Sequence, residues 1–95
     1  MNSFLRCEKW RVHGRVQRVG FRHFSMRAAH RHRIQGAARN EPDGTVEIIA
    51  IGTPSDLEGY YRDILKGPSL SNVTHVERYP INYDTITLDA YDLAF

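Results

Sequence analysis

The chain has 95 residues and a mass of 11.0 kDa, the size of one domain, and the whole of residues 1–95 is assigned to it. Hydrophobic residues make up 41%, so the chain is expected to fold, and a single cysteine, Cys7, excludes an internal disulfide and a cysteine-based zinc site. No apolar run has the length of a membrane span, and the first residues lack the apolar core of a signal peptide. We therefore expect a cytoplasmic monomer without a membrane partner.

The net charge of +2 conceals a strong separation of charge along the chain. Residues 1–40 contain ten of the thirteen Lys and Arg residues and one acid, Glu8, whereas residues 41–95 contain ten acids. This separation is typical either of two solvated surfaces that attract each other or of a positive potential focused on an anion-binding site. Composition alone leaves both interpretations open.

The first half of the chain reads as a strand, a turn and a helix. Residues 4–13 predict a strand, in which Trp10 and Val12 share one face. A turn rich in glycine and arginine, "HGRVQRVGFR", follows it. Apolar side chains at three- and four-residue spacing then predict a helix over residues 22–33.

The middle of the chain predicts a hairpin. The turn cluster "EPDG" separates residues 34–40 from residues 45–52, and the second of these segments is rich in β-branched residues. A second helix begins after Thr53, which is suited to cap it, and Pro54 fits its first position. Gly67 and Pro68 are typical of its end.

Residues 72–79 predict a further strand, and residues 85–91, "TITLDAY", predict a short edge strand. The order β-α-β-β-α-β predicts an α+β, ferredoxin-like sandwich, with two helices on one face of an antiparallel sheet. This architecture hosts many functions, so the function has to come from a site.

The turn between the first strand and the first helix is the candidate site. Backbone N–H groups at a helix start, with the helix dipole behind them, form a cradle for an anion. Gly14 and Gly20 permit the unusual backbone angles of such a cradle, and Arg22 is placed to bind a carboxylate or phosphate bidentately. An ordinary loop with solvated arginines explains the same residues equally well.

Three segments of the chain resemble the acylphosphatase family. "GRVQRVGFR" resembles the family signature G-R-V-Q-G-V-G-F-R, and "GAARNEPDGTVEI" resembles the pattern G-x-x-x-N-x-x-D-G-x-V-E. "KGPSLSNVTHVE" resembles a third stretch, G-P-x-x-A-x-V, with Ser71 in place of alanine. The resemblance extends from about Arg11 to Glu77, which is most of the chain.

The resemblance implies a small hydrolase that splits acyl phosphates into a carboxylate and inorganic phosphate, with no metal and no cofactor. Arg22 matches the substrate-binding arginine, and Asn40 matches the asparagine that orients the water. The C-terminal carboxylate, at Phe95, would lie near Arg22 if the tail folds back. The phosphoryl oxygens would be held by loop amides from Arg15, Val16, Gln17, Arg18, Val19, Gly20 and Phe21.

The chain departs from the family pattern at three positions of interest. Arg18 replaces a loop glycine, and because its neighbours are all kept, we expect a backbone angle there that is open to non-glycine residues. Its side chain is expected in solvent at the mouth of the site, where it raises the positive potential without contacting the phosphoryl group. Arg33 stands at a frequent glycine and is expected to weaken the helix end, while His32 is expected to be half-buried.

Other interpretations are weaker. The five histidines lack the spacing of a metal site, and Cys7 lacks an activating neighbour. A small RNA-binding module is disfavoured because residues 45–52 carry no aromatic side chains, so nucleic acid is not an expected partner. A domain that binds phosphate or carbamoyl phosphate without turnover, like the acylphosphatase-like segment of hydrogenase-maturation proteins, remains an alternative.

Overall fold

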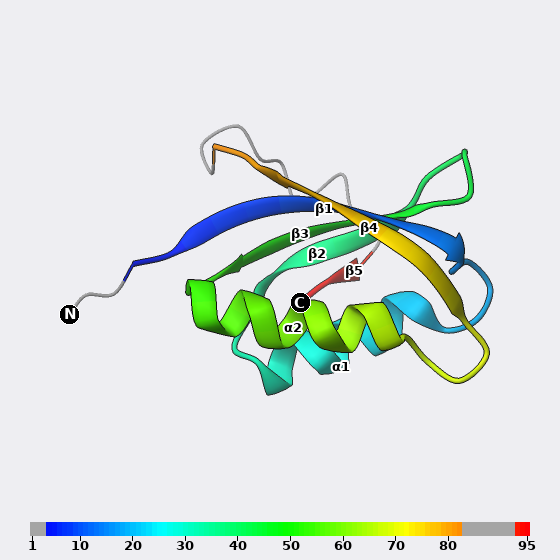
Figure 1. Cartoon of the computed structure of the whole chain (residues 1–95), viewed down its shortest axis with the longest axis horizontal. Coiled ribbons are helices and arrows are strands. Elements are labelled where there is room, and N and C mark those ends of the chain that lie inside the picture. The colour runs from blue at the N-terminus through cyan, green and yellow to red at the C-terminus, as the bar shows by residue number, and fades with distance from the viewer. Residues whose placement is uncertain (1–3, 83–92) are drawn as a thin grey trace.

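The computed structural model describes residues 4–82 and 93–95 and contains the predicted order of strands and helices, followed by a two-residue strand (Figure 1). The predicted edge strand at residues 85–91 lies outside the described residues. The elements are β1 (Arg6–Arg15), α1 (Phe21–Arg31), β2 (Gln35–Asn40), β3 (Val46–Gly52), α2 (Pro54–Lys66), β4 (Asn72–Pro80) and β5 (Leu93–Ala94).

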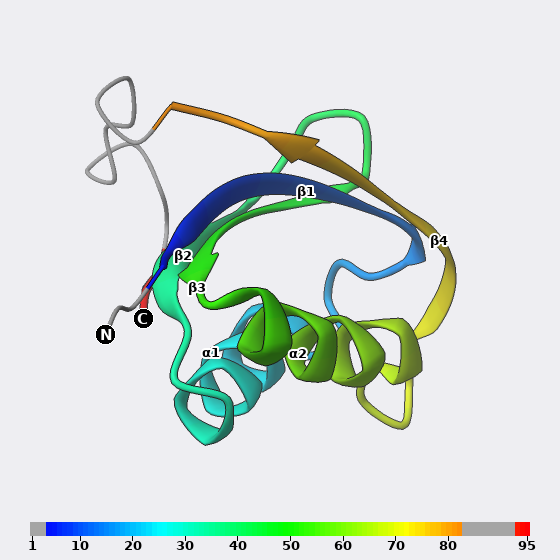
Figure 2. The ribbon, with the colours of Figure 1, turned by 60° about the vertical axis from the view of Figure 1, so that its left-hand side comes forward.

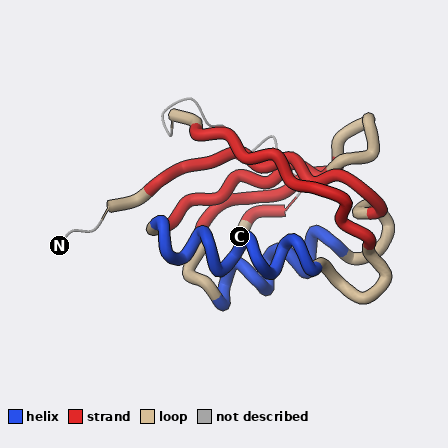
Figure 3. The backbone as a smooth tube through the Cα atoms, in the orientation of Figure 1, coloured by secondary structure: helices blue, strands red, loops and turns tan. Residues whose placement is uncertain are grey.

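The five strands form one sheet in the order β4-β1-β3-β2-β5, and every neighbouring pair is antiparallel. Both helices cover the same face of this sheet, as the view in Figure 2 and the tube in Figure 3 show. The predicted ferredoxin-like sandwich is therefore confirmed. Neither described helix has the length and apolar character that crossing a membrane requires.

The core lies between the sheet and the two helices. Trp10 and Val12 point from β1 toward the helices and are fully buried, as the period-2 pattern predicted. The rings of Trp10 and Tyr60 stack with their centroids 5.2 Å apart, and Leu57 and Ile64 complete the buried stripe of α2. Full burial of such side chains contributes about 1.5–3 kcal/mol each, so this face holds the two layers together.

The opposite face of the sheet carries a row of alternating charges. The strand register places Arg39, Glu47, Arg11 and Glu77 side by side across four strands. Glu47 is nearly buried and accepts contacts from Arg39 at 3.3 Å and from Arg11 at 3.5 Å. Basic residues of the first half of the chain thus neutralise acids of the second half on this face.

Helix α1 occupies a shorter segment than residues 22–33. It begins at Phe21 and ends at Arg31, because Arg33 adopts a positive φ of 61° and turns the chain away. The N–H of Ile34 then donates to the carbonyl of Ala29 at 2.8 Å, and that of Arg33 to His30 at 3.4 Å. These two bonds form a Schellman motif with arginine at the position that glycine usually occupies.

Candidate functional site: an anion cradle at the start of α1

Three loops lie at the same end of the molecule, on the right-hand side of Figure 1. They are residues 16–20 between β1 and α1, residues 41–45 between β2 and β3, and residues 67–71 between α2 and β4. The candidate site lies in the first of these loops.

Apolar side chains anchor this loop to the core. Val16, the first residue of the loop, and Phe21, the first residue after it, belong to the buried core, and Val19 packs against the same cluster. Just before the loop, β1 and β4 approach so closely that a Cβ on Gly14 would lie 2.1 Å from the carbonyl oxygen of Asn72. Gly14 also has a φ of 118°, so glycine is required there for both reasons.

The backbone N–H groups of residues 16–21 are not used in hydrogen bonds within the described part of the protein. Within the described residues, no backbone carbonyl or side chain accepts a hydrogen bond from them. Gly20 caps α1 in the left-handed conformation without a side-chain hydrogen bond, and the first turn contains no acid. Helix α2 differs, because Thr53 accepts a hydrogen bond from the N–H of Asp56 at 3.1 Å. The start of α1 therefore presents its donors and its dipole to an anion.

Arg22 and Asn40 occupy positions beside this loop. Arg22 is half-buried in the first turn of α1. Asn40 is the last residue of β2, where it pairs with Val46 and shares the helix-facing side of the strand with Ala38. The Oδ1 atom of Asn40 is buried and accepts no hydrogen bond from the described residues, although the residue takes part in another interaction.

The side chain of Gln17 ties the cradle to the turn that follows Asn40. Its Nε2 atom donates to the carbonyl of Glu41 at 2.8 Å and to that of Thr45 at 2.9 Å. The sequence predicted a role for the backbone of Gln17 and missed this role of its side chain. The two acceptors lie 24 and 28 residues away, and no local pattern signals such a contact.

The prediction for the backbone at position 18 was wrong. Arg18 has a φ of 64°, in the left-handed region that favours glycine. The neighbours explain this angle, because Gln17 is fastened to the hairpin and Val19 to the core, so the chain between them has to turn sharply. The prediction that the Arg18 side chain is exposed is confirmed.

The other end of α1 is closed by contacts within the protein. His32, half-buried as predicted, lies 2.8 Å from Asp63 of α2 through its Nε2 atom, and Arg31 binds the same carboxylate at 3.1 Å. The His32 ring fills a space beside Gly59, where a Cβ would lie 2.7 Å from it. Burial raises the pKa of Asp63, but hydrogen bonds from His32 and Arg31 outweigh burial and hold the pKa below its ordinary value.

The histidines do not assemble a metal site in the described part of the chain, where no group of three metal-binding side chains occurs. His13 and His75 stack on the open face of the sheet with ring centroids 4.0 Å apart. His13 also lies 2.8 Å from Glu77, and this hydrogen bond is the main cause that lowers the pKa of Glu77.

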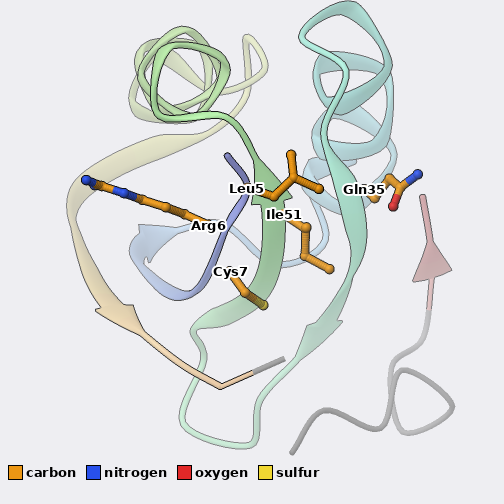
Figure 4. Close-up of a pocket in the computed structure, with 5 residues that line it drawn as sticks. All are labelled: Leu5, Arg6, Cys7, Gln35 and Ile51. Atoms are coloured by element: carbon orange, nitrogen blue, oxygen red, sulfur yellow. The ribbon is translucent and has the colours of Figure 1, made fainter. Parts of the chain in front are cut away.

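Cys7 lies at the far end of the sheet from the cradle. It lines a pocket of about 200 Å³ together with Leu5, Arg6, Gln35 and Ile51 (Figure 4). Burial, and to a lesser degree the carboxylate of Glu8, raises the pKa of its thiol. The thiol is therefore protonated at neutral pH, which is unfavourable for a nucleophile.

The C-terminus does fold back onto the sheet. The N–H of Phe95 donates to the carbonyl of Gly36 at 2.8 Å, and its ring contacts Tyr60 edge to face. Gly36 is four residues before Asn40 on β2, toward the end of the strand away from the cradle.

Comparisons with known proteins point to one family. The model of the family described as Acylphosphatase matches residues 8–89. An acylphosphatase of Solibacter usitatus is 45% identical over 71 residues, covering 75% of this chain and 74% of its own. One from Nitratidesulfovibrio vulgaris is 42% identical over 86 residues, covering 88% and 85%.

Solved structures agree with the sequence comparisons. The crystal structure of acylphosphatase from Bacillus subtilis superimposes with a TM-score of 0.78 at 30% identity, covering 95% of this chain and 94% of that one. Full-length HypF in a phosphate- and nucleotide-bound form gives a TM-score of 0.79 at 26% identity. That match covers 94% of this chain and 11% of HypF.

Proposed function

Because this chain belongs to the acylphosphatase family, a family of hydrolases, we propose that it hydrolyses acyl phosphates to a carboxylate and inorganic phosphate. The observation that carries the proposal is the run of N–H groups at residues 16–21 that leads into the start of α1. Such a run suits the oxygens of a phosphoryl group. Arg22, in the first turn, supplies a forked cationic donor for the same group.

The proposed reaction depends on positioning and charge stabilisation. Water attacks the phosphorus atom, the bond between phosphorus and the acyl oxygen breaks, and the carboxylate leaves with the electron pair. A carboxylate is a weak base and a good leaving group, so the reaction needs no strong general base and, as proposed, no metal. The N–H groups and Arg22 stabilise the charge that spreads over the phosphoryl oxygens.

Asn40 is proposed to orient the attacking water. Its amide can accept a hydrogen bond from the water through Oδ1 but cannot remove the proton. The proton therefore passes to a phosphoryl oxygen of the substrate. The double hydrogen bond from Gln17 to the turn after Asn40 supports this role, because it fixes that turn relative to the cradle.

A second candidate is a domain that binds phosphate or carbamoyl phosphate without turning it over. The similarity to a segment of HypF, whose solved structure is described as phosphate- and nucleotide-bound, favours this candidate. An RNA-binding module is less favoured, because the charged row on the open face of the sheet leaves Arg11 and Arg39 engaged by acids.

Hydrolysis of benzoyl phosphate, measured with and without a chelator, tests the proposal. We expect steady-state release of benzoate and phosphate that the chelator does not change. Binding of phosphate without turnover would support the second candidate. Activity that the chelator abolishes and a divalent cation restores would contradict the proposed mechanism.

A further inference from the structure

Arg18 has a strained backbone conformation, and its side chain makes no contact with the described residues that would stabilise the fold. A left-handed conformation is unfavourable for a non-glycine residue. The Arg18 side chain is exposed, and it forms no hydrogen bond, ion pair or ring contact with the described residues. Strain without a compensating contact marks a position at which a function is to be sought.

The position of Arg18 is fixed even though its side chain is exposed. On one side, Gln17 is held by two hydrogen bonds to the β2–β3 turn, and on the other side Val19 packs on the core. The backbone of Arg18 therefore cannot swing away from the cradle. Arg18 lies in the middle of the loop, and its side chain is exposed to solvent.

The charges around the loop favour a second anion there. The acids of the neighbouring turn face other partners, since Glu41 is bound by Arg39 and Asp43 by Arg11 and Thr45. No acid occurs between Lys9 and Asn40 in the sequence. Among the described residues, no acid pairs with the cation at position 18.

We propose that the side chain of Arg18 binds a second negative charge on the acyl group of the substrate. This inference rests on the proposed hydrolysis of acyl phosphates. The phosphoryl group occupies the N–H groups of the cradle, and the acyl group points outward, where the Arg18 guanidinium meets a carboxylate or phosphate on it. The preferred substrates are then acyl phosphates whose acyl group carries its own anionic group.

A matched pair of substrates tests the proposal: benzoyl phosphate and 3-carboxybenzoyl phosphate, which differ by one carboxylate. We expect the intact protein to favour the carboxylated substrate about five- to tenfold in kcat/KM, a ratio typical of one charge-assisted contact. Arg18→Gln should remove most of this preference, and Arg18→Lys should retain a large part of it, because lysine keeps the charge.

Arg33→Gln is the matched control. Arg33 is also an exposed arginine with a positive φ, at the other end of α1, so its replacement removes the same charge from a similar backbone. We expect this variant to keep the full preference. An equal loss of the preference in both variants would overturn a direct contact. So would a preference that disappears at 0.5 M salt, because long-range attraction is screened within about 4 Å there.

Binding of unreactive analogues separates this inference from the proposed function. Benzylphosphonate and 3-carboxybenzylphosphonate present the same two groups and cannot be hydrolysed by attack on an anhydride. A preference for the second in Kd that depends on Arg18, in a protein without turnover, would support the contact and refute the hydrolysis. Equal Kd values in the intact protein would refute the contact whatever the activity.

Discussion

An arginine in the left-handed conformation lies near each end of α1, but the contacts around the two arginines differ. At the C-terminal end, Arg33 closes a Schellman motif, and His32 and Arg31 fasten the helix to Asp63. At the N-terminal end, Arg18 precedes a helix start that has no side-chain cap and no acid.

We infer that the C-terminal end of α1 contributes to stability and that the N-terminal end contributes to the proposed function. The C-terminal end uses its backbone and side-chain groups within the fold, so it contributes to stability. At the N-terminal end, the N–H groups of residues 16–21 have no acceptor among the described residues, an arrangement that suits the proposed anion. Substitutions at the N-terminal end are therefore expected to change activity, and substitutions at the C-terminal end are expected to change stability.

The largest effects are expected from the two proposed catalytic residues at the N-terminal end. Arg22→Ala and Asn40→Ala should each lower kcat/KM for benzoyl phosphate by about 100-fold or more, as loss of a positioned donor or of an orienting amide does elsewhere. Arg22→Ala should act mainly through KM and Asn40→Ala mainly through kcat. Circular dichroism should show the fold retained, and a kcat near that of the intact protein for Asn40→Ala would refute its role with the water.

The next largest effect is expected at Gln17, which joins the cradle to the β2–β3 turn. Gln17→Leu removes both hydrogen bonds and should lower stability by about 1–2 kcal/mol in denaturant unfolding. It should also lower kcat about tenfold, because small displacements of positioning groups slow catalysis strongly. Gln35→Leu, at an exposed glutamine of β2, is the control. A loss of stability with an unchanged kcat would show that the tie is only structural.

The C-terminal end should respond in stability and not in activity. Because the pKa of Asp63 is lower in the folded protein than in the unfolded chain, its carboxylate stabilises the fold at pH values above the ordinary aspartate pKa. This stabilisation is lost as the pH falls through the lower, folded pKa. Asp63→Asn should therefore cost about 1 kcal/mol at pH 7, and the difference should shrink as the pH falls below about 4. Its kcat/KM should equal that of the intact protein, and a pH-independent difference would contradict the ionic explanation.

Much of the fold could be predicted from the sequence. The apolar spacing, the "EPDG" turn and the Thr53–Pro54 start indicated the order of elements, because each is a local signal. The helix end was predicted at residue 33, two residues too late, although the resemblance placed a glycine at that position and Arg33 adopts a positive φ there.

The rest depended on contacts between distant parts of the chain. The side chain of Gln17 reaches two carbonyls across the site, and these contacts help to force Arg18 into its left-handed angle. A local preference against positive φ, worth about 1–2 kcal/mol, is smaller than the combined anchoring of its neighbours. The sequence therefore predicted the exposure of Arg18 but not its backbone.

The smallest expected effect compares the two arginines directly. Arg18→Gly and Arg33→Gly should each raise the free energy of unfolding by roughly 0.5–1 kcal/mol, because relief of the left-handed angle exceeds the greater flexibility of glycine in the unfolded chain. The two φ values, 64° and 61°, predict similar gains. Arg18→Ala and Arg33→Ala are the controls, since alanine removes the charge but keeps the strain, and neither should be stabilised. If Arg18→Ala were stabilised as much as Arg18→Gly, repulsion among the cations of the loop, and not the backbone angle, would be the source of the gain. Only the replacements at position 18 should also reduce the preference for a carboxylated substrate, which would separate the strain shared by both ends from the function assigned to one.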